Sequence, residues 1–230
     1  MVIPFYDEQE NVDRLVNSLS NVFNKHKVDF ELVCIDNGSS DNTGSLLKKA
    51  SLINSRVKVV SVPENLGYGW GVKQGFAAAK GEVICLGWGD NQVLPEVFYE
   101  VFERFNQTDC DLCKVTRVVR QDGFNRIVES KGFNFLFSVF FGSKVFDVNG
   151  CPKVFSRKLL DEFTLLSNDY FLDAEIVIGV LQKKGKIVDV PCKFLKREAG
   201  KSSVGFFTIY EFMANMLRYR LLNINIWRRS

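Results

Sequence analysis

Short apolar runs alternate with helical segments four times in the first half of this chain. Runs with the length of buried strands lie at 2–5, 30–35, 57–62 and 82–86, and the segments between them carry apolar residues at helical spacing. Because strand–helix–strand units join parallel strands through right-handed crossovers, this alternation predicts an α/β fold with a mostly parallel central sheet flanked by helices. Pro4 cannot donate a backbone hydrogen bond, which predicts an irregular or terminal position for the first strand.

The rest of the chain has a weaker pattern. Its length of 230 residues suits one domain with a sizeable core. We expect that domain at 1–204, followed at 205–230 by an amphipathic helix and a basic tail. Further strands are predicted at 111–116 and 186–190, and further helices at 95–105, 155–165, 173–184 and 208–222.

Composition argues against some classes of function. The net charge of +3 is too small to indicate a nucleic-acid partner. The six cysteines lie mostly in strand-like runs, which predicts small buried side chains in a reducing compartment. Cys110 and Cys113 form a C-x-x-C pair, but no second pair completes a zinc site. The single histidine, His26, argues against chemistry that depends on a histidine base.

The loop after the fourth strand carries two hard oxygen ligands, Asp90 and Gln92. Gly87 and Gly89 precede them and let the backbone approach a ligand closely. Ligands of α/β folds bind at the carboxyl ends of parallel strands. One carboxylate and one amide cannot enclose a cation, so they suit Mg²⁺ or Mn²⁺ that takes its other ligands from phosphate and water. The alternative is a polar loop that binds no metal.

Two more polar loops follow the first and second strands, at 6–8 and 36–41, and we expect them at the same edge of the sheet. Their carboxylates can accept hydrogen bonds from a base or a ribose. Together the three loops predict a site for a nucleoside diphosphate whose charge a metal neutralises. The chain has no P-loop motif, and the glycines at 67–71 lack the spacing of a dinucleotide fingerprint, so we expect that loop to pack against the sheet edge or a donor sugar.

Six blocks of the sequence stand out in order: VIPFYDEQENV, CIDNGSSDNT, ENLGYGWGVKQGFAAAKGEVI, GDNQVLPE, FDVNGCPKVFSRKLL and KREAGKSSV. Together they resemble inverting family 2 glycosyltransferases of the GT-A fold. The resemblance is strongest to the dolichyl- and polyprenyl-phosphate sugar transferases, the dolichol-phosphate mannosyltransferase-like group. It covers nearly all of residues 2–204.

The resemblance implies roles for individual residues. Those implied to bind the donor are Pro4, Tyr6, Glu8, Asp36, Gly67, Asp90, Arg197 and Ser202. Asp90 and Gln92 are implied to hold the metal. Arg117, Arg126 and Lys131 are implied to meet the acceptor phosphate, with Asp147 near the reaction centre, and these four form the implied catalytic set together with Asp90.

The chain departs from the family pattern at three positions. Trp88 replaces the first aspartate of the metal motif, which weakens the metal site or shifts its geometry. Ser203 stands where the family usually has lysine, and Asn37 replaces a second aspartate, whose hydrogen bonds we expect an amide to reproduce. The departures at 88 and 203 leave open a catalytically impaired relative that binds nucleotide sugars.

The resemblance predicts an inverting transfer from a UDP- or GDP-sugar to dolichyl or undecaprenyl phosphate. A lipid monophosphate, with a second pKa of about 6, is already largely ionised near neutral pH and attacks the anomeric carbon without a general base. The cation would stabilise the departing nucleoside diphosphate. The alternative is a saccharide hydroxyl as acceptor, with Asp173 or Glu175 as the base.

A membrane surface is the second partner that the resemblance suggests. The apolar stretch at 133–141 and the helix at 208–222 are too short or too charged to span a bilayer. The arginines near the end of the chain, at 218, 220, 228 and 229, suit anionic headgroups. We therefore expect a cytoplasmic protein that lies peripherally on the cytoplasmic membrane face. The alternative is that the last helix packs on the core or on a second subunit, as in a homodimer.

Overall fold

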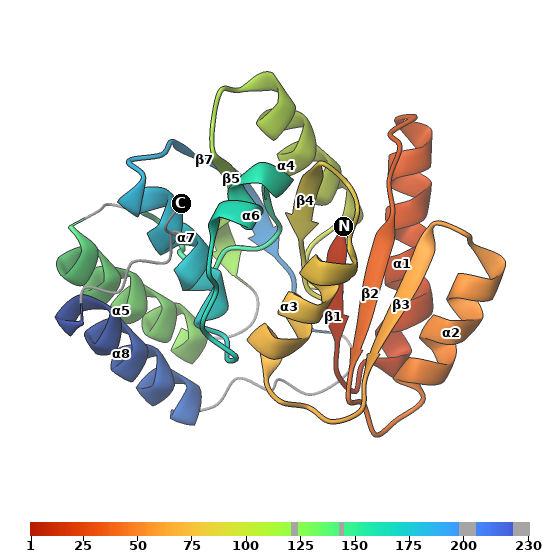
Figure 1. Ribbon diagram of the computed structural model, residues 1–230, viewed down its shortest axis with the longest axis horizontal. Helices are drawn as coiled ribbons and strands as arrows, with labels where there is room; N and C mark the ends of the chain where they lie inside the picture. Colours follow the sequence, from red (N-terminus) through yellow and green to blue (C-terminus); the bar gives the residue numbers. More distant parts are fainter. Residues whose placement is uncertain (121–123, 143–144, 198–205, 223–230) are drawn as a thin grey trace.

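Seven strands form one central sheet with helices on both faces in this computed structural model, which describes residues 1–120, 124–142, 145–197 and 206–222 (Figure 1). The strands are β1 (Val2–Phe5), β2 (Leu32–Asn37), β3 (Val57–Val62), β4 (Val83–Leu86), β5 (Leu112–Arg120), β6 (Lys153–Ser156) and β7 (Ile187–Phe194). The helices are α1 (Gln9–Lys25), α2 (Thr43–Ile53), α3 (Tyr68–Ala78), α4 (Pro95–Gln107), α5 (Phe124–Phe141), α6 (Arg157–Glu162), α7 (Leu172–Gln182) and α8 (Phe206–Leu221).

The sheet is mostly parallel, as the alternating pattern predicts. Its strand order is β3-β2-β1-β4-β6-β5-β7. The first four strands run parallel to one another, and β5 runs parallel to β7. β6 alone is antiparallel to its neighbours, β4 and β5. The predicted α/β fold class is therefore confirmed.

Alternate residues of the central strands face two separate apolar layers. Ile3 and Cys34 point to the face covered by α1 and α4, where Phe23 and Phe98 are buried. Val2 and its counterparts in β2 and β4 point to the opposite face, against α3, α6 and α7. Five of the six cysteines are buried and all six are free thiols, which confirms that they act as small apolar side chains.

β6 is the strand that the sequence pattern does not predict. It has four residues, and its first, Lys153, is completely buried in the middle of the sheet. The ammonium group lies 2.9 Å from the carboxylate of Asp173 in α7, which supplies the charge that allows its burial. β5 repeats this arrangement, because Lys114 is equally buried and pairs with Asp189 of β7. A charged residue inside a short strand removes the apolar pattern on which prediction depends.

β1 is the third strand of seven, and Pro4 lies near its end, where the pairing with β4 is irregular. The proline is tolerated there for a local reason. The N–H of Gly87 donates to the carbonyl of Val2, so alternate residues, including Pro4, face β4. The register pairs Val2 of β1 with Leu86 of β4. The two strands then separate before a backbone N–H at position 4 would be needed as a donor.

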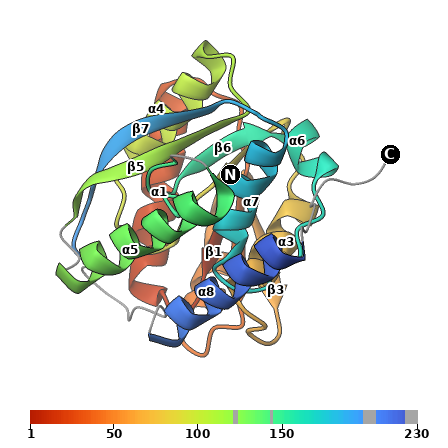
Figure 2. The ribbon, with the colours of Figure 1, turned by 90° about the vertical axis from the view of Figure 1, so that its left-hand side faces the viewer.

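α8 packs beside α5 along one end of the molecule (Figure 2). Met216 and Tyr219 of α8 are buried in the core, next to Phe137 of α5. Within the described ranges, no helix combines the length and the apolar character that a bilayer crossing needs.

We predict that replacing Lys153 with methionine destabilises the fold. The change leaves the Asp173 carboxylate buried without its cation, and breaking a buried ion pair in this way costs about 3–5 kcal/mol. Urea denaturation of the variant and the natural protein measures this difference. The matched control is Arg56→Gln, which breaks a pair whose partner, Asp29, is fully exposed, and it should leave stability almost unchanged. Equal effects of the two substitutions would contradict the prediction.

Candidate active site

The structure brings the three polar loops together at one edge of the sheet. The first follows β1, the second follows β2, and the third, at 87–94, follows β4. Phe5 of β1 lies directly beside Asp36 of β2 in the parallel register, so both loops leave the sheet at the same level. This is the edge at which α/β folds bind ligands.

Glu8 and Asp90 share one guanidinium group, that of Arg197. The Nη1 atom of Arg197 lies 2.7 Å from Oε1 of Glu8, and its Nη2 atom lies 3.3 Å from Oδ2 of Asp90. Asn11 donates to the other oxygen of Glu8 at 2.5 Å, and the backbone N–H of Gln92 donates to the other oxygen of Asp90 at 3.1 Å. Three predicted donor-binding residues from three distant segments therefore meet in one cluster.

Burial sets the acidity of this cluster. It raises the pKa of Glu8 from 4.5 to about 6, although Arg197 acts in the opposite direction. Burial likewise raises the pKa of Asp90 despite the same guanidinium. One positive charge thus serves two carboxylates that have lost much of their hydration. Hard carboxylate oxygens of this kind fit Mg²⁺ or Mn²⁺.

Gln92 makes contacts beyond its predicted role as a metal ligand, which stays a prediction. Its side-chain amide donates to the carbonyl of Leu195 at 2.9 Å, and the N–H of Leu195 returns a bond of 2.9 Å to the carbonyl of Gln92. The residue thereby fixes the backbone two positions before Arg197. Its contacts are those of a positioning residue for the arginine.

The loop after β2 is ordered by Asp7, which is not among the predicted site residues, and by Asp36, which is. Asp7, in the left-handed region with a φ of 51°, accepts from the backbone N–H of Ser40 at 2.7 Å. Asp36 accepts from the N–H of Ser39 at 3.1 Å and fills the space where Gly44 of α2 has no side chain. Tyr6 is 37% exposed at this edge and is available to a ligand.

The glycine-rich segment is helical, not the loop that we expect. α3 starts at Tyr68, immediately after Gly67 with its φ of 109°. A Cβ atom at Gly69 would lie 2.7 Å from the carbonyl of Ser167, and one at Gly67 would collide with the carbonyl of Asn168. These glycines allow close packing of α3 on the 167–169 segment, and the donor-binding role of Gly67 stays a prediction.

Asn37 makes a hydrogen bond that the aspartate of the family pattern could not make. Its buried side-chain amide donates to the carbonyl of Gly67 at 3.1 Å. An ionised aspartate has no hydrogen to donate there. The amide therefore ties the end of β2 to the start of α3.

Trp88 occupies the position of the first metal-motif aspartate and is fixed from several sides. Its indole Nε1–H donates to the hydroxyl of Tyr68 at 3.0 Å. The ring of Phe194 meets the indole edge to face at a centroid distance of 6.1 Å. The guanidinium of Arg117 lies over the same indole, 5.6 Å from the ring centroid. The indole supplies no oxygen ligand to a cation.

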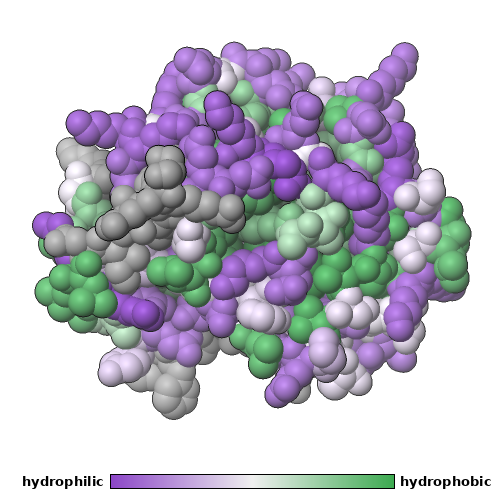
Figure 3. Space-filling view, viewed as in Figure 1, coloured by the Kyte–Doolittle hydropathy of each residue, from purple (hydrophilic) through white to green (hydrophobic). Residues whose placement is uncertain are grey.

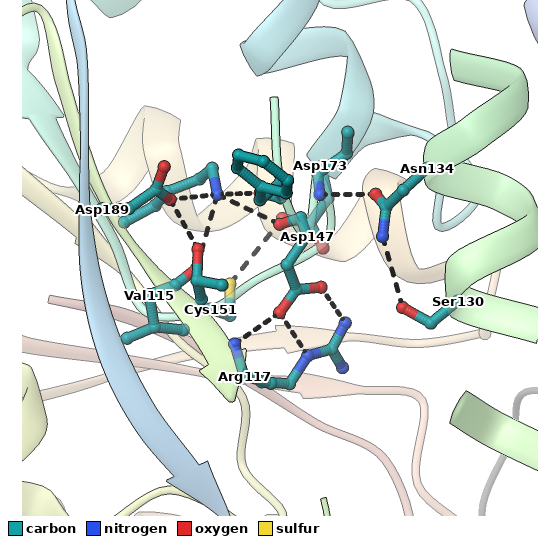
Figure 4. Close-up of polar contacts among 12 residues, drawn as sticks. Val115, Arg117, Ser130, Asn134, Asp147, Cys151, Asp173 and Asp189 are labelled. Atoms are coloured by element: carbon teal, nitrogen blue, oxygen red, sulfur yellow. Dashed lines mark hydrogen bonds and ion pairs between the residues drawn. The ribbon is translucent and has the colours of Figure 1, made fainter. Parts of the chain in front are cut away.

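Arg117 and Asp147 form a buried pair, and Figure 4 shows the carboxylate turned toward the arginine. The arginine side chain is 7% exposed and bonds both carboxylate oxygens, while its backbone N–H adds a third bond of 2.8 Å. Burial alone would raise the pKa of Asp147, but the hydrogen bonds and charge of Arg117 outweigh it and lower the pKa. Arg117 therefore binds an internal carboxylate where we predict an acceptor phosphate.

The turn that carries Asp147 is held from two further directions. The ammonium group of Lys114 donates to the carbonyls of Phe146 and Asp147, at 2.5 and 3.2 Å. Asn134 of α5 accepts from the N–H of Val148 at 2.9 Å. Neither Lys114 nor Asn134 is among the residues predicted from the sequence. A lysine inside the apolar run LCKV is the one signal that could have identified the former.

The two predicted bases are engaged elsewhere. Asp173 is 1% exposed and pairs with Lys153. Glu175 is buried, accepts from the N–H groups of Leu166 and Ser167, and contacts the hydroxyl of Tyr219. Of the predicted catalytic set, Lys131 is exposed on α5. The side chains of Arg126 and Ser202 lie outside the described part of the chain, and position 203 does as well.

Comparison with known proteins agrees with this geometry. The family model described as "Glycosyl transferase family 2" matches residues 1–164. Crystal structures of glucosyl-3-phosphoglycerate synthase from Mycobacterium tuberculosis are similar in fold. Its complex with Mn²⁺, UDP and glucosyl-3-phosphoglycerate is 18% identical, covers 95% of this chain and 78% of that chain, and has a TM-score of 0.75. Its complex with Mg²⁺ and UDP has the same four values. Its complex with Mn²⁺, UDP and phosphoglyceric acid is 18% identical, covers 94% and 76% of the two chains, and has a TM-score of 0.76.

The sheet order and the layers of helices are those of the GT-A fold of glycosyltransferases. Because the family model matches well over half of the chain, the protein belongs to glycosyl transferase family 2. It is therefore a glycosyltransferase by family, as the sequence resemblance predicts. The assignment to the polyprenyl-phosphate group stays a prediction.

The pKa of Glu8 predicts a loss of stability as the pH rises. The native state binds this proton more tightly than the unfolded chain, so the stabilisation is complete below the unfolded pKa of 4.5 and is lost as the pH passes the native value of about 6. A shift of this size corresponds to about 2 kcal/mol. Relative to Glu8→Gln, which does not titrate, the natural protein should lose this amount of unfolding free energy between about pH 4 and about pH 7.5. Urea denaturation of both proteins at each pH measures it, and an unchanged difference between them would refute it.

Proposed function

We propose that this protein transfers a sugar from a nucleoside diphosphate sugar to a hydroxyl group of an acceptor, with inversion at the anomeric carbon. The observation that carries the proposal is the Glu8–Asp90–Arg197 cluster at the carboxyl ends of β1 and β4, in a chain of family 2. The similar synthase was crystallised with UDP-glucose and phosphoglyceric acid. A UDP-sugar is therefore the first donor to test.

Mg²⁺ or Mn²⁺ is the cofactor that suits this donor, and both occur in complexes of the similar synthase. In our proposal, the carboxylate of Asp90 would hold the ion, whose other ligands would come from the diphosphate and water. The ion would supply positive charge to the diphosphate as it leaves. Arg197 would bind the same diphosphate through its guanidinium, which matches phosphate oxygens well.

A hydroxyl acceptor is favoured over a phosphate acceptor by the contacts of Arg117. Both of its terminal contacts to Asp147 are charge-assisted, and the pair is nearly buried. Binding of an acceptor phosphate there would leave the Asp147 carboxylate buried without its cation, which is costly. A hydroxyl acceptor needs a base, and in our proposal Asp173, which lies beside the Tyr68–Trp88 pair, would act as one after separating from Lys153.

We predict that Asp90→Ala abolishes metal-dependent transfer. Removal of the carboxylate takes away the predicted ligand of the ion that stabilises the leaving group, and rates should fall by about 100-fold or more. Release of nucleoside diphosphate is measured from a panel of UDP- and GDP-sugars, with Mg²⁺, with Mn²⁺ and with EDTA. The acceptors are phosphoglyceric acid, saccharides and undecaprenyl phosphate.

The control for this assay is Asp29→Ala, which removes a fully exposed carboxylate and should retain the natural rate. Release that persists in EDTA or in Asp90→Ala would contradict the metal role. Donor binding without release from any acceptor would favour the third interpretation, a catalytically impaired relative.

A polyprenyl phosphate is the second candidate acceptor, because α5 and α8 expose an apolar face. Phe135 and Val139 form a stripe on α5, and the stripe on α8 consists of Tyr210, Met213, Leu217 and Leu221. In Figure 3, hydrophobic surface gathers at the left edge, where one end of α8 lies in Figure 1. A cavity of about 360 Å³ between these helices and α7 is lined by apolar residues of α5 and by Arg220. Apolar chain and anionic head together match a lipid phosphate at a membrane surface.

We predict that Leu217→Glu weakens binding to anionic vesicles by about tenfold, since it removes apolar area from this face and adds repulsion. Co-sedimentation with phosphatidylglycerol vesicles measures the affinity. The control, Leu52→Glu, changes a leucine on α2 that is even more exposed than Leu217, and it should bind as the natural protein does. Equal binding by both variants would reject the membrane contact. Concentration-dependent dimers that Leu217→Glu disrupts would assign the face to a second copy.

A further inference from the structure

The protein itself places a positive charge, the guanidinium of Arg197, at the proposed donor site. Arg197 bridges Glu8 and Asp90, at 2.7 and 3.3 Å, and its side chain is 21% exposed. A divalent cation that binds Asp90 must therefore compete with a guanidinium. Trp88 offers no oxygen to such a cation, and Gln92, whose amide nitrogen donates to Leu195, offers only its Oε1 atom beside Asp90.

We propose that Arg197 holds the place of the cation, and that the metal enters only together with the nucleoside diphosphate. The inference rests on the proposed function, whose donor it concerns. A free cation would have to displace the arginine and leave its guanidinium without the two carboxylates. A metal–diphosphate complex brings negative oxygens of its own, to which the guanidinium can transfer. The arginine then moves from carboxylate to phosphate while the metal takes its place at Asp90.

The backbone near Arg197 is built for such an exchange. Two hydrogen bonds join Gln92 and Leu195, each of 2.9 Å. They fix the chain at 195 to the same loop that carries Asp90. The side chain of Arg197 can therefore change partners while its attachment point stays close to the diphosphate position. This assigns Gln92 a positioning role in addition to its predicted one as a ligand.

Measurement of Mn²⁺ binding tests the exchange without any transfer reaction. The electron paramagnetic resonance signal of free Mn²⁺ gives the affinity of the full chain, with and without UDP. The natural protein should bind Mn²⁺ at least about tenfold more tightly with UDP, after correction for Mn²⁺ bound to UDP alone. Arg197→Gln should bind Mn²⁺ about tenfold more tightly than the natural protein when UDP is absent, because the competing charge is gone.

Two further variants serve as controls, one that conserves the charge at position 197 and one at a distant surface arginine. Arg197→Lys keeps the charge but loses the fork that reaches both carboxylates, so its affinity without UDP should lie between those of the other two proteins. Arg56→Gln removes a distant surface arginine and should behave as the natural protein does. Circular dichroism confirms that each variant is folded.

The outcomes separate the inference from the function on which it rests. If Arg197→Gln binds Mn²⁺ no more tightly than the natural protein while UDP still binds with metal, the exchange is wrong and the donor site stands. Equal Mn²⁺ affinity of the natural protein with and without UDP has the same meaning. If UDP binds to none of the folded variants with any metal, the donor site fails and the inference fails with it.

Discussion

Two carboxylates lie buried where the parallel sheet ends, and the structure around them depends on how that charge is balanced. Glu8 and Asp90 come from loops after neighbouring strands, β1 and β4. Their burial is costly without a positive partner. Arg197, which follows β7, supplies that partner. It thereby links the loops after β1 and β4 to the segment after β7. The same rule governs the interior, where Lys153 and Lys114 meet Asp173 and Asp189.

The fold is predictable from the sequence where apolar periodicity is its main determinant. β1 to β4 have mostly apolar runs, and the strands lie within two residues of the predicted bounds. Apolar periodicity does not predict the elements that depend on a buried ion pair or on close packing at a glycine. Lys153 makes β6 look polar, because its pairing with Asp173 is invisible in the sequence. Gly69 makes α3 look like a loop, although the glycine serves close packing against Ser167.

The candidate site follows the same division. Chain topology predicts that Glu8 and Asp90 lie at one edge, since parallel strands end together. Partner choice among polar side chains is not predictable in this way. Arg117 has an acceptor phosphate as its expected partner and Asp147 as its observed one. The residue type of Arg117 suggests that it binds an anion, but only the three-dimensional structure shows that the anion is the Asp147 carboxylate.

Trp88 connects these observations. With an indole in place of the first aspartate, the Arg117 guanidinium lies over the ring, and Asp147 supplies its carboxylate partner. A carboxylate at position 88 would stand beside the same guanidinium and compete with Asp147 for it. The loss of one acid from the metal motif and the internal pairing of Arg117 are therefore consistent parts of one charge arrangement. In that arrangement Asp90 is the acid of the motif that remains. This explains why the single guanidinium of Arg197 can balance the carboxylates of the site.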